Sequence, residues 1–291
     1  MPCLLRRSRG LCAGVLSALI FFVSASSLLA EDAVSGMHID IPGVKLWVTD
    51  TGGLGTPIVL LHSNTGNSDI WAPQASAFSR AGYRVIAFDR RGWGRSIPDP
   101  SGPQPGSIAG DLDALVDHLR LGKFHLIGVA GGGFAALDYA AWRPEHVQSL
   151  VIGGSTGDLK DKEIADFIAR IEIPEIRKQP AAYLEVAPSY RGANPEGTAR
   201  WNDINANSRQ PEAAAQPLHT PNTYTKIATI TAPTLIIAAD ADLLAPPALM
   251  QLWAAHMKSF EWTTMQDAGH AMAWEQPAVF NKLVLDFLAQ H

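Results

Sequence analysis

The sequence predicts an α/β fold built on a mostly parallel sheet, and three observations support this prediction. Short, nearly continuous apolar runs recur along the chain, as is typical of strands buried on both faces of a parallel sheet. Segments with apolar residues at helical spacing lie between these runs, and such alternation produces right-handed βαβ units. The length of 291 residues, with 47% hydrophobic and 18% charged residues, fits one large globular domain, with or without an insertion. This composition excludes a disordered chain and a polytopic membrane protein.

The predicted elements begin with a β-hairpin. Its alternating pattern covers Met37 to Ile41 and Val44 to Thr49, on either side of Pro42-Gly43. Later strands are expected at Pro57 to His62, Tyr83 to Asp89, Phe124 to Val129, Gln148 to Gly153 and Thr234 to Ala239. Helices between them are expected at Trp71 to Ala81, Ile108 to Leu119 and Phe134 to Trp142.

The interval from Asp158 to Ile230 interrupts this alternation. It is rich in Pro, Asn and Arg, contains candidate helices at Lys160 to Ile171 and Gln179 to Val186, and shows no pattern of a buried strand. We therefore predict a mostly helical cap at residues 158–230, inserted into a core formed by residues 31–157 and 231–291.

Residues 1–30 have the layout of a secretory signal peptide. Three arginines precede an apolar run from Leu11 to Val23, and small residues follow up to Ala30. Cleavage after Ala25 or after Ala30 fits this pattern. A retained single-span anchor is the alternative, although the apolar run is shorter than the ~20 residues that a span requires. We therefore expect a periplasmic or secreted protein with no stable membrane span after processing.

Charge and cysteine content restrict the partners and the chemistry of the mature chain. The formal charge of −5 becomes −8 without the three arginines of residues 1–30, and an acidic body argues against nucleic acid as a partner. Both cysteines, Cys3 and Cys12, lie in the same segment, so its removal excludes disulfides, thiolate nucleophiles and cysteine-ligated metals. No pattern indicates a phosphate loop, a metal cluster or a dinucleotide fingerprint, and we expect no cofactor.

The segment from Gly128 to Gly132 lies between a predicted buried strand and a helix rich in small residues. Flanking glycines permit the tight strand-to-helix turn that presents a nucleophile in the pattern Gly-x-Ser-x-Gly. The central residue here is Ala130, whose methyl side chain is no nucleophile. Taken alone, the pattern is equally compatible with a turn that only packs a helix against a strand.

Four further motifs occur at the ends of predicted strands. They are Leu60-Leu61-His62-Ser63-Asn64, Asp89-Arg90-Arg91-Gly92-Trp93-Gly94-Arg95-Ser96, Ala239-Asp240-Ala241-Asp242 and Asp267-Ala268-Gly269-His270. Together with the turn at Ala130, and in this order, they resemble the α/β-hydrolase family over nearly all of residues 37–290. The resemblance implies a mostly parallel eight-stranded sheet, helices on both faces and a helical cap.

The resemblance also implies roles for individual residues. His270 corresponds to the general base, and Asp242 to the acid that orients it, with Asp240 as the alternative acid. The backbone N–H groups of Asn64 and Gly131 correspond to the oxyanion hole that stabilises a developing negative charge.

Two further residues are candidate substrate contacts. Ser63 replaces the glycine that usually follows the histidine of the oxyanion loop, and Trp201 belongs to a stretch of the cap that mixes aromatic and amide groups. The alternatives are a loop hydrogen bond for Ser63 and an exposed helix edge for Trp201.

Ala130 leaves two interpretations open. Either a Ser-to-Ala change has removed the nucleophile, or the chain encodes alanine naturally, since the family includes members without the serine of the elbow. In both cases we predict hydrolysis of a small carbonyl substrate, an ester, lactone or amide, with His270 and Asp242 as the working dyad. The alternatives are an inactive binding protein with the same fold and a lyase that uses the same dyad.

Overall fold

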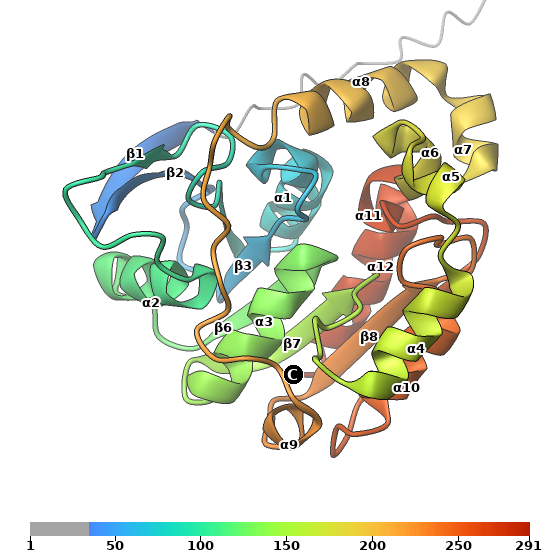
Figure 1. Ribbon diagram of the computed structural model, residues 1–291. Coiled ribbons are helices and arrows are strands. Elements are labelled where there is room, and N and C mark those ends of the chain that lie inside the picture. The colour runs from blue at the N-terminus through green and yellow to red at the C-terminus, as the bar shows by residue number, and fades with distance from the viewer. Residues whose placement is uncertain (1–34) are drawn as a thin grey trace, which may run out of the picture. The chain divides into compact units, whose positions relative to one another are not determined.

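A nine-stranded sheet forms the centre of residues 35–291, the part of the chain that the computed structural model describes (Figure 1). Eight strands follow in the order β1-β2-β4-β3-β6-β7-β8-β9, and the short β5 pairs with β2. The strands are β1 (Gly36–Ile41), β2 (Val44–Asp50), β3 (Pro57–Leu61), β4 (Arg84–Phe88), β5 (Ile97–Pro98), β6 (Phe124–Val129), β7 (Val147–Gly153), β8 (Thr234–Ala239) and β9 (Glu261–Met265). The predicted signal peptide, with both cleavage sites, lies outside the described residues.

The strand pairing confirms the predicted fold class. β1 and β2 form the expected antiparallel hairpin, and β2 joins β4 in antiparallel fashion. From β4 onward, through β3, β6, β7, β8 and β9, each neighbouring pair is parallel. β3, β6 and β8 are almost wholly buried along their length, which explains their continuous apolar sequences.

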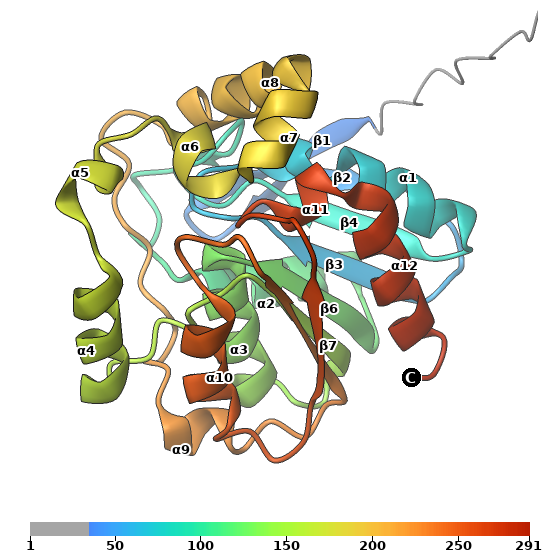
Figure 2. The same cartoon turned by 90° about the vertical axis from the view of Figure 1, so that its right-hand side faces the viewer.

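Helices cover both faces of this sheet (Figure 2). The helices of the core are η1 (Ser68–Trp71), α1 (Ala72–Arg80), α2 (Ile108–Leu119), α3 (Gly131–Trp142), α10 (Pro247–Ala254), α11 (Met272–Glu275) and α12 (Pro277–Leu288). α2 has the predicted bounds, whereas α3 begins at Gly131 rather than at Phe134. The three glycines have low helix propensity, but they are buried in the turn and follow directly after Ala130, which occupies the N-cap position without a side-chain hydrogen bond.

Two hydrophobic clusters fix the helices to the sheet. One contains Leu112 of α2, Leu137 of α3 and Trp253 of α10, together with side chains from one face of the strands. The other contains Phe78 of α1 and Phe280 of α12 with side chains from the opposite face. This is the two-sided burial that an α/β sheet requires.

The segment between β7 and β8 contains six helices and none of the nine strands of the sheet. The helices are α4 (Lys162–Ile171), α5 (Pro174–Arg177), α6 (Ala181–Glu185), α7 (Pro188–Ala193), α8 (Pro195–Ala206) and α9 (Tyr224–Ile227). α6, α7 and α8 lie across the carboxyl ends of the strands, and α4 lies beside α10 (Figures 1 and 2). Within residues 35–291, none of the helices combines the length and the apolar character that crossing a membrane demands.

Candidate active site

Ala130 occupies a sharp turn between β6 and α3. Its φ of 50° and ψ of −118° are unusual for a residue with a side chain. Two close approaches require glycine on either side of this turn. A Cβ atom at Gly128 would lie 2.5 Å from the carbonyl oxygen of Gly132, and one at Gly132 would lie 2.1 Å from that of Leu61. The flanking glycines are therefore required for packing, and the geometry is that of a nucleophile elbow with a methyl group in the nucleophile's place.

His270 and Asp242 form a buried hydrogen-bonded pair. The Nδ1 atom of His270 lies 2.9 Å from Oδ2 and 3.1 Å from Oδ1 of Asp242, whose side chain is fully buried. The backbone N–H groups of Leu244 and Ala245 donate to Oδ1 at 2.7 and 2.8 Å, which fixes the carboxylate. Asp240, the alternative acid, is exposed and is not in this pair.

The surroundings of His270 favour its charged form. Burial lowers the pKa of an imidazole, but the nearby carboxylates, Asp242 foremost, together outweigh burial, and the pKa of His270 is raised above its ordinary value. The carboxylates of Glu185 and Glu275 act in the same direction. Because Nδ1 is engaged by Asp242, Nε2 is the ring nitrogen that remains for a proton-transfer partner.

The predicted oxyanion donors lie next to each other. A Cβ atom at Gly131 would meet the Asn64 side chain at 2.4 Å, so the two residues are in contact. Gly131 opens α3, where backbone N–H groups have no acceptor within the helix. Neither the N–H of Gly131 nor that of Asn64 donates to an acceptor in the loop and cap hydrogen bonds of residues 35–291.

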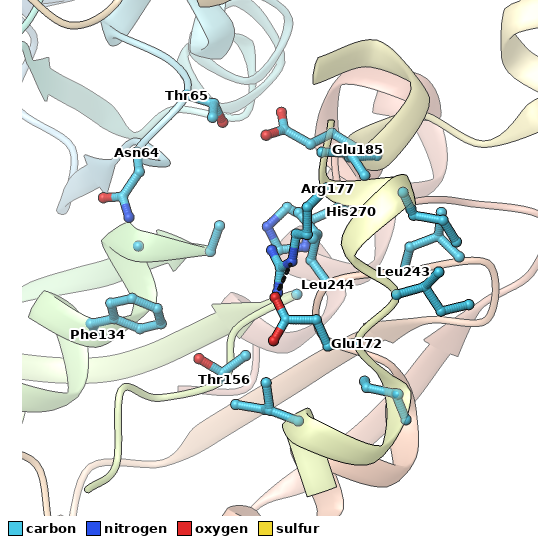
Figure 3. A pocket seen from close by; sticks show the side chains of 18 residues that line it. Asn64, Thr65, Phe134, Thr156, Glu172, Arg177, Glu185, Leu243, Leu244 and His270 are labelled. Atoms are coloured by element: carbon cyan, nitrogen blue, oxygen red, sulfur yellow. Dashed lines mark hydrogen bonds and ion pairs between the residues drawn. The ribbon is translucent and has the colours of Figure 1, made fainter. Parts of the chain in front are cut away.

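These groups line one cavity of about 620 Å³ beneath the cap (Figure 3). Its wall contains Asn64, Ala130, Gly131 and His270 and is otherwise mostly apolar. The apolar side chains come from α4, α5, α6 and the loop after β8: Ile168, Ile171, Ile173, Ile176, Leu184, Leu243 and Leu244. A cavity of this size and lining suits a small, largely apolar molecule with one polar reacting group.

The two candidate substrate contacts lie elsewhere around Ala130. Ser63 and Trp201 line a much smaller hollow, of about 20 Å³, which also touches Ala130 and His270. Both residues are buried, and Trp201 packs against Trp274 with ring centroids 5.6 Å apart. Trp201 is therefore part of the contact between cap and core rather than an exposed helix edge.

Glu185 is a site residue that the sequence did not reveal. It belongs to α6, is buried, and lines the large cavity together with His270 (Figure 3). Its carboxylate accepts a hydrogen bond from Nε1 of Trp201 at 3.1 Å, and burial raises its pKa. The only hint in the sequence is one acidic residue within the otherwise apolar run Ala181 to Ala187.

Glu275 joins the cap to the loop that carries His270. Its carboxylate accepts backbone hydrogen bonds from Ala187 at 2.9 Å and from Gly269 at 3.0 Å. The backbone N–H of Ala271 donates to the carbonyl oxygen of Glu185 at 2.8 Å. The cap and the histidine loop are thus held together on both sides of His270.

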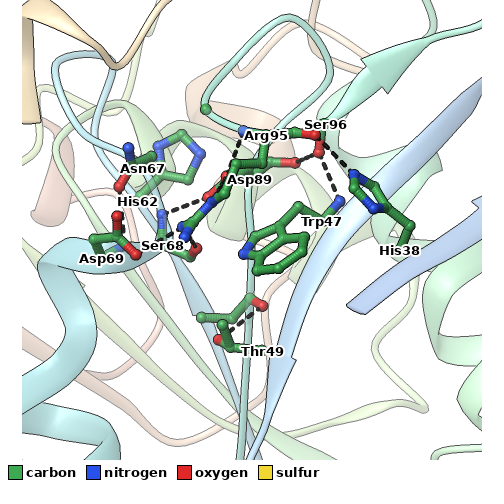
Figure 4. Close-up of polar contacts among 12 residues, drawn as sticks. His38, Trp47, Thr49, His62, Asn67, Ser68, Asp69, Asp89, Arg95 and Ser96 are labelled. Atoms are coloured by element: carbon green, nitrogen blue, oxygen red, sulfur yellow. Dashed lines mark hydrogen bonds and ion pairs between the residues drawn. The ribbon is translucent and has the colours of Figure 1, made fainter. Parts of the chain in front are cut away.

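The motif from Asp89 to Ser96 shapes the loop after β4 (Figure 4). Asp89 accepts hydrogen bonds from the N–H groups of Ser68 at 2.7 Å and Arg95 at 2.8 Å. The hydroxyl of Ser96 donates to the carbonyl oxygen of Asp89 and accepts from the N–H of Trp47 on β2. These contacts are structural, and within residues 35–291 no group of three acidic or histidine side chains could hold a metal ion.

Comparisons with known proteins identify relatives along most of the chain. Residues 58–283 match the model of the family described as the alpha/beta hydrolase family. A predicted carbamate hydrolase, RutD of Variovorax paradoxus (strain S110), is 32% identical over 80% of this chain and 91% of its own. A 2-hydroxy-6-oxononadienedioate/2-hydroxy-6-oxononatrienedioate hydrolase of Klebsiella pneumoniae is 28% identical over 87% of this chain and 95% of its own. A thermophilic esterase from Thermogutta terrifontis superposes with a TM-score of 0.74 at 23% identity, covering 87% of this chain and 98% of its own.

Proposed function

The chain belongs to the alpha/beta hydrolase family, and we propose that it hydrolyses a small ester, lactone or amide by direct attack of water. In this proposal His270 is the general base and Asp242 orients it. No covalent intermediate forms at residue 130, because alanine offers no nucleophile. The N-terminal pattern of residues 1–30 further supports export to the periplasm or beyond the cell.

One observation carries this proposal. His270, which is hydrogen-bonded to the buried Asp242, lines the same cavity as the predicted oxyanion donors Asn64 and Gly131, although the elbow residue lacks a hydroxyl. General-base catalysis requires a basic nitrogen within reach of the attacking molecule, and an oxyanion hole requires free N–H donors aimed at the same place. Neither requirement involves the side chain of Ala130.

The proposed reaction proceeds in two steps. His270 Nε2 takes a proton from water while the water oxygen bonds to the carbonyl carbon, and the N–H groups of Asn64 and Gly131 receive the resulting oxyanion. The tetrahedral intermediate then expels the alkoxide or amine as the carbonyl re-forms, and the imidazolium returns the proton to that leaving group. Asp242 stabilises the imidazolium between the steps and keeps the proton of the resting ring on Nδ1.

A binding protein without turnover is the second candidate function. The missing hydroxyl at Ala130 favours this function, because the cavity can hold a ligand even though no acyl-enzyme can form. The two candidates differ in whether purified protein releases product over many turnovers.

The test measures hydrolysis of short-chain p-nitrophenyl esters by the full chain and by His270→Ala. We expect slow turnover without an initial burst, and a loss of about 10²- to 10⁴-fold in the variant, as is usual when a general base is removed. His118→Ala is the matched control, since His118 is exposed on α2 and should keep full activity. Equal rates for the chain and for His270→Ala would exclude the proposal and favour the binding protein.

Ala130→Ser tests whether the elbow is intact. The variant should fold, react with a fluorophosphonate probe and show a burst of p-nitrophenol that equals the enzyme concentration, whereas the unchanged chain does neither. A folded but unlabelled Ala130→Ser would show that His270 cannot deprotonate a group at this position, which contradicts the geometry proposed here.

A further inference from the structure

Arg90 is a buried cation without an acidic partner. Only 3% of its surface is exposed, and it takes part in no ion pair within residues 35–291. Its Nη1 donates to Oδ1 of Asn64 at 3.0 Å and its Nη2 lies 3.5 Å from the carbonyl oxygen of Ser63, whereas its Nε has no partner. Both acceptors are neutral, so much of the hydrogen-bonding capacity of this guanidinium is unused and no carboxylate offsets its charge.

The neighbouring arginines show how unusual this arrangement is. Arg91 is buried to the same extent but pairs with Asp111 at 2.6 Å, and Arg95 pairs with Asp69 and Asp89. Burial, followed by repulsion from the charge of Arg209, lowers the pKa of Arg90 to about 9. Burying a lone cation costs free energy, and such a cost is usually compensated by a bound anion or a functional role.

A second arginine lies beside the first one. Both guanidinium groups pack against Trp93, with the guanidinium carbons of Arg90 and Arg209 at 4.2 and 5.4 Å from its ring centroid. The backbone bridge between Trp93 and Arg209 and a hydrogen bond from Arg209 to the carbonyl oxygen of Ala213 hold the exposed Arg209 in place. Arg209 is likewise in no ion pair of the described structure.

Both arginines line a second cavity, of about 400 Å³. It shares Asn64, Gly131 and Phe134 with the large cavity, so the two cavities adjoin at the predicted oxyanion hole. Its other walls are largely apolar: Trp93, Ile108, Ala215, Pro217 and Leu218. The one carboxylate in its lining is Asp158, which is engaged by Lys160 at 2.7 Å.

We propose that Arg90 and Arg209 form a carboxylate-binding subsite next to the oxyanion hole, so that the substrate is a small carbonyl compound bearing a carboxylate on an apolar stem. Two planar guanidinium groups suit a carboxylate, which can accept two parallel hydrogen bonds from each fork. The apolar walls between them and Asn64 suit the stem. The substrate class rests on the proposed hydrolysis, whereas the subsite itself can be tested without turnover.

The experiment measures binding by calorimetry in the full chain carrying His270→Ala, which should not consume the probe. The probes are monomethyl adipate and methyl hexanoate, which share the ester and the chain length and differ by one carboxylate. We expect monomethyl adipate to bind at least about 10-fold more tightly, with a preference that decreases at high salt. Equal binding of the two esters, or binding of inorganic phosphate as tight as that of monomethyl adipate, would overturn the carboxylate subsite.

Three arginine variants in the same background assign the preference. Arg90→Met and Arg209→Gln should each reduce the preference for monomethyl adipate over methyl hexanoate to less than 3-fold. Arg209 is exposed, so Arg209→Gln provides the test if Arg90→Met does not fold. Arg177→Gln is the control, because Arg177 lines the large cavity but pairs with Glu172 at 3.1 Å. A preference that survives Arg209→Gln, or that Arg177→Gln abolishes equally, would refute the assignment. The His270→Ala background has no turnover in the proposed mechanism, so a preference for monomethyl adipate in this background supports the carboxylate subsite independently of the hydrolysis.

Discussion

Asp242→Asn is the sharpest test of the His270–Asp242 pair, because the structure dictates how the new amide must lie. Oδ1 of Asp242 accepts hydrogen bonds from the N–H groups of Leu244 and Ala245, so this position must remain an oxygen. The amide nitrogen then replaces Oδ2, which lies 2.9 Å from Nδ1 of His270. Two N–H groups cannot face each other, and the imidazole avoids this by moving its proton to Nε2.

The magnitude follows from the loss of the basic nitrogen. In the proposed mechanism Nε2 must accept a proton from water, and in the wrong tautomer it already carries one. We expect kcat/KM to fall by about 10³- to 10⁴-fold, which corresponds to about 4 to 5.5 kcal/mol of transition-state stabilisation. The change in stability should be small by comparison, since the backbone hydrogen bonds to Oδ1 persist.

The assay is the initial rate of p-nitrophenyl butyrate hydrolysis between pH 5 and pH 9. The rate of the unchanged chain should rise with pH through the pKa of His270, which is raised above 6.5, because only the neutral ring accepts a proton. Asp240→Asn is the control, since Asp240 lies two positions earlier in the same loop but is exposed. A loss below 10-fold in Asp242→Asn, or an equal loss in Asp240→Asn, would refute the reasoning.

Three further predictions concern the cap, the elbow and the response to acid. Glu185→Gln removes a carboxylate that helps to raise the pKa of His270, so the acid limb of the pH profile of kcat/KM should move to lower pH. Glu172→Gln is the control: it removes a carboxylate from a half-exposed ion pair and should leave the acid limb in place. Gly132→Ala places a methyl group 2.1 Å from the Leu61 carbonyl oxygen and should lower the free energy of unfolding in urea by about 3 kcal/mol or more, whereas Gly192→Ala, with open space around it, should raise it by up to about 1 kcal/mol. Burial lowers the pKa of His125 to about 4, whereas the same histidine in the unfolded chain has a pKa of 6.5. Between these values the unfolded chain binds the proton and the folded chain does not, so the contribution of His125 to the free energy of unfolding is full above pH 6.5 and should be about 2 kcal/mol smaller at pH 5. The decrease should be smaller in His125→Gln. A loss of stability between pH 7 and pH 5 that is the same in the unchanged chain and in His125→Gln would contradict this last prediction.

The sequence predicted those features that depend on local pattern. Fully buried parallel strands have continuous apolar runs, and the glycines around Ala130 mark a close approach of two backbones, so β6, β8 and the elbow were visible in advance. His270 and Asp242 could be paired only through the family resemblance, because 28 positions separate them and no local pattern indicates their contact.

The features that the sequence did not reveal arise from contacts between the cap or its flanking loop and the core. Glu185 becomes a site residue because α6 lies over the loop of His270, and Arg209 becomes one because its backbone bridges to Trp93. Arg90 belongs to a motif that the sequence shows, but only the folded structure reveals that it has no acidic partner within residues 35–291. Helical periodicity in an insertion gives the length of each helix and not the place where it docks, which is why these residues were missed.

Ala130 has a strained backbone conformation, although its methyl side chain takes no part in the proposed chemistry. A φ of 50° costs a residue with a Cβ atom about 1 to 2 kcal/mol relative to glycine, so the conformation must be imposed by its neighbours. The N–H of Ala130 donates to the carbonyl oxygen of Gly153 at 2.9 Å, and the hydroxyl of Ser155 donates to the carbonyl oxygen of Ala130 at 2.8 Å. These bonds hold the turn, which makes Gly131 the first residue of α3, beside Asn64. In the proposed mechanism the strain therefore serves the oxyanion hole. A tetrahedral intermediate carries the same negative charge whether serine or water supplies the attacking oxygen. The elbow is therefore needed to position the oxyanion donors even in a chain without the hydroxyl.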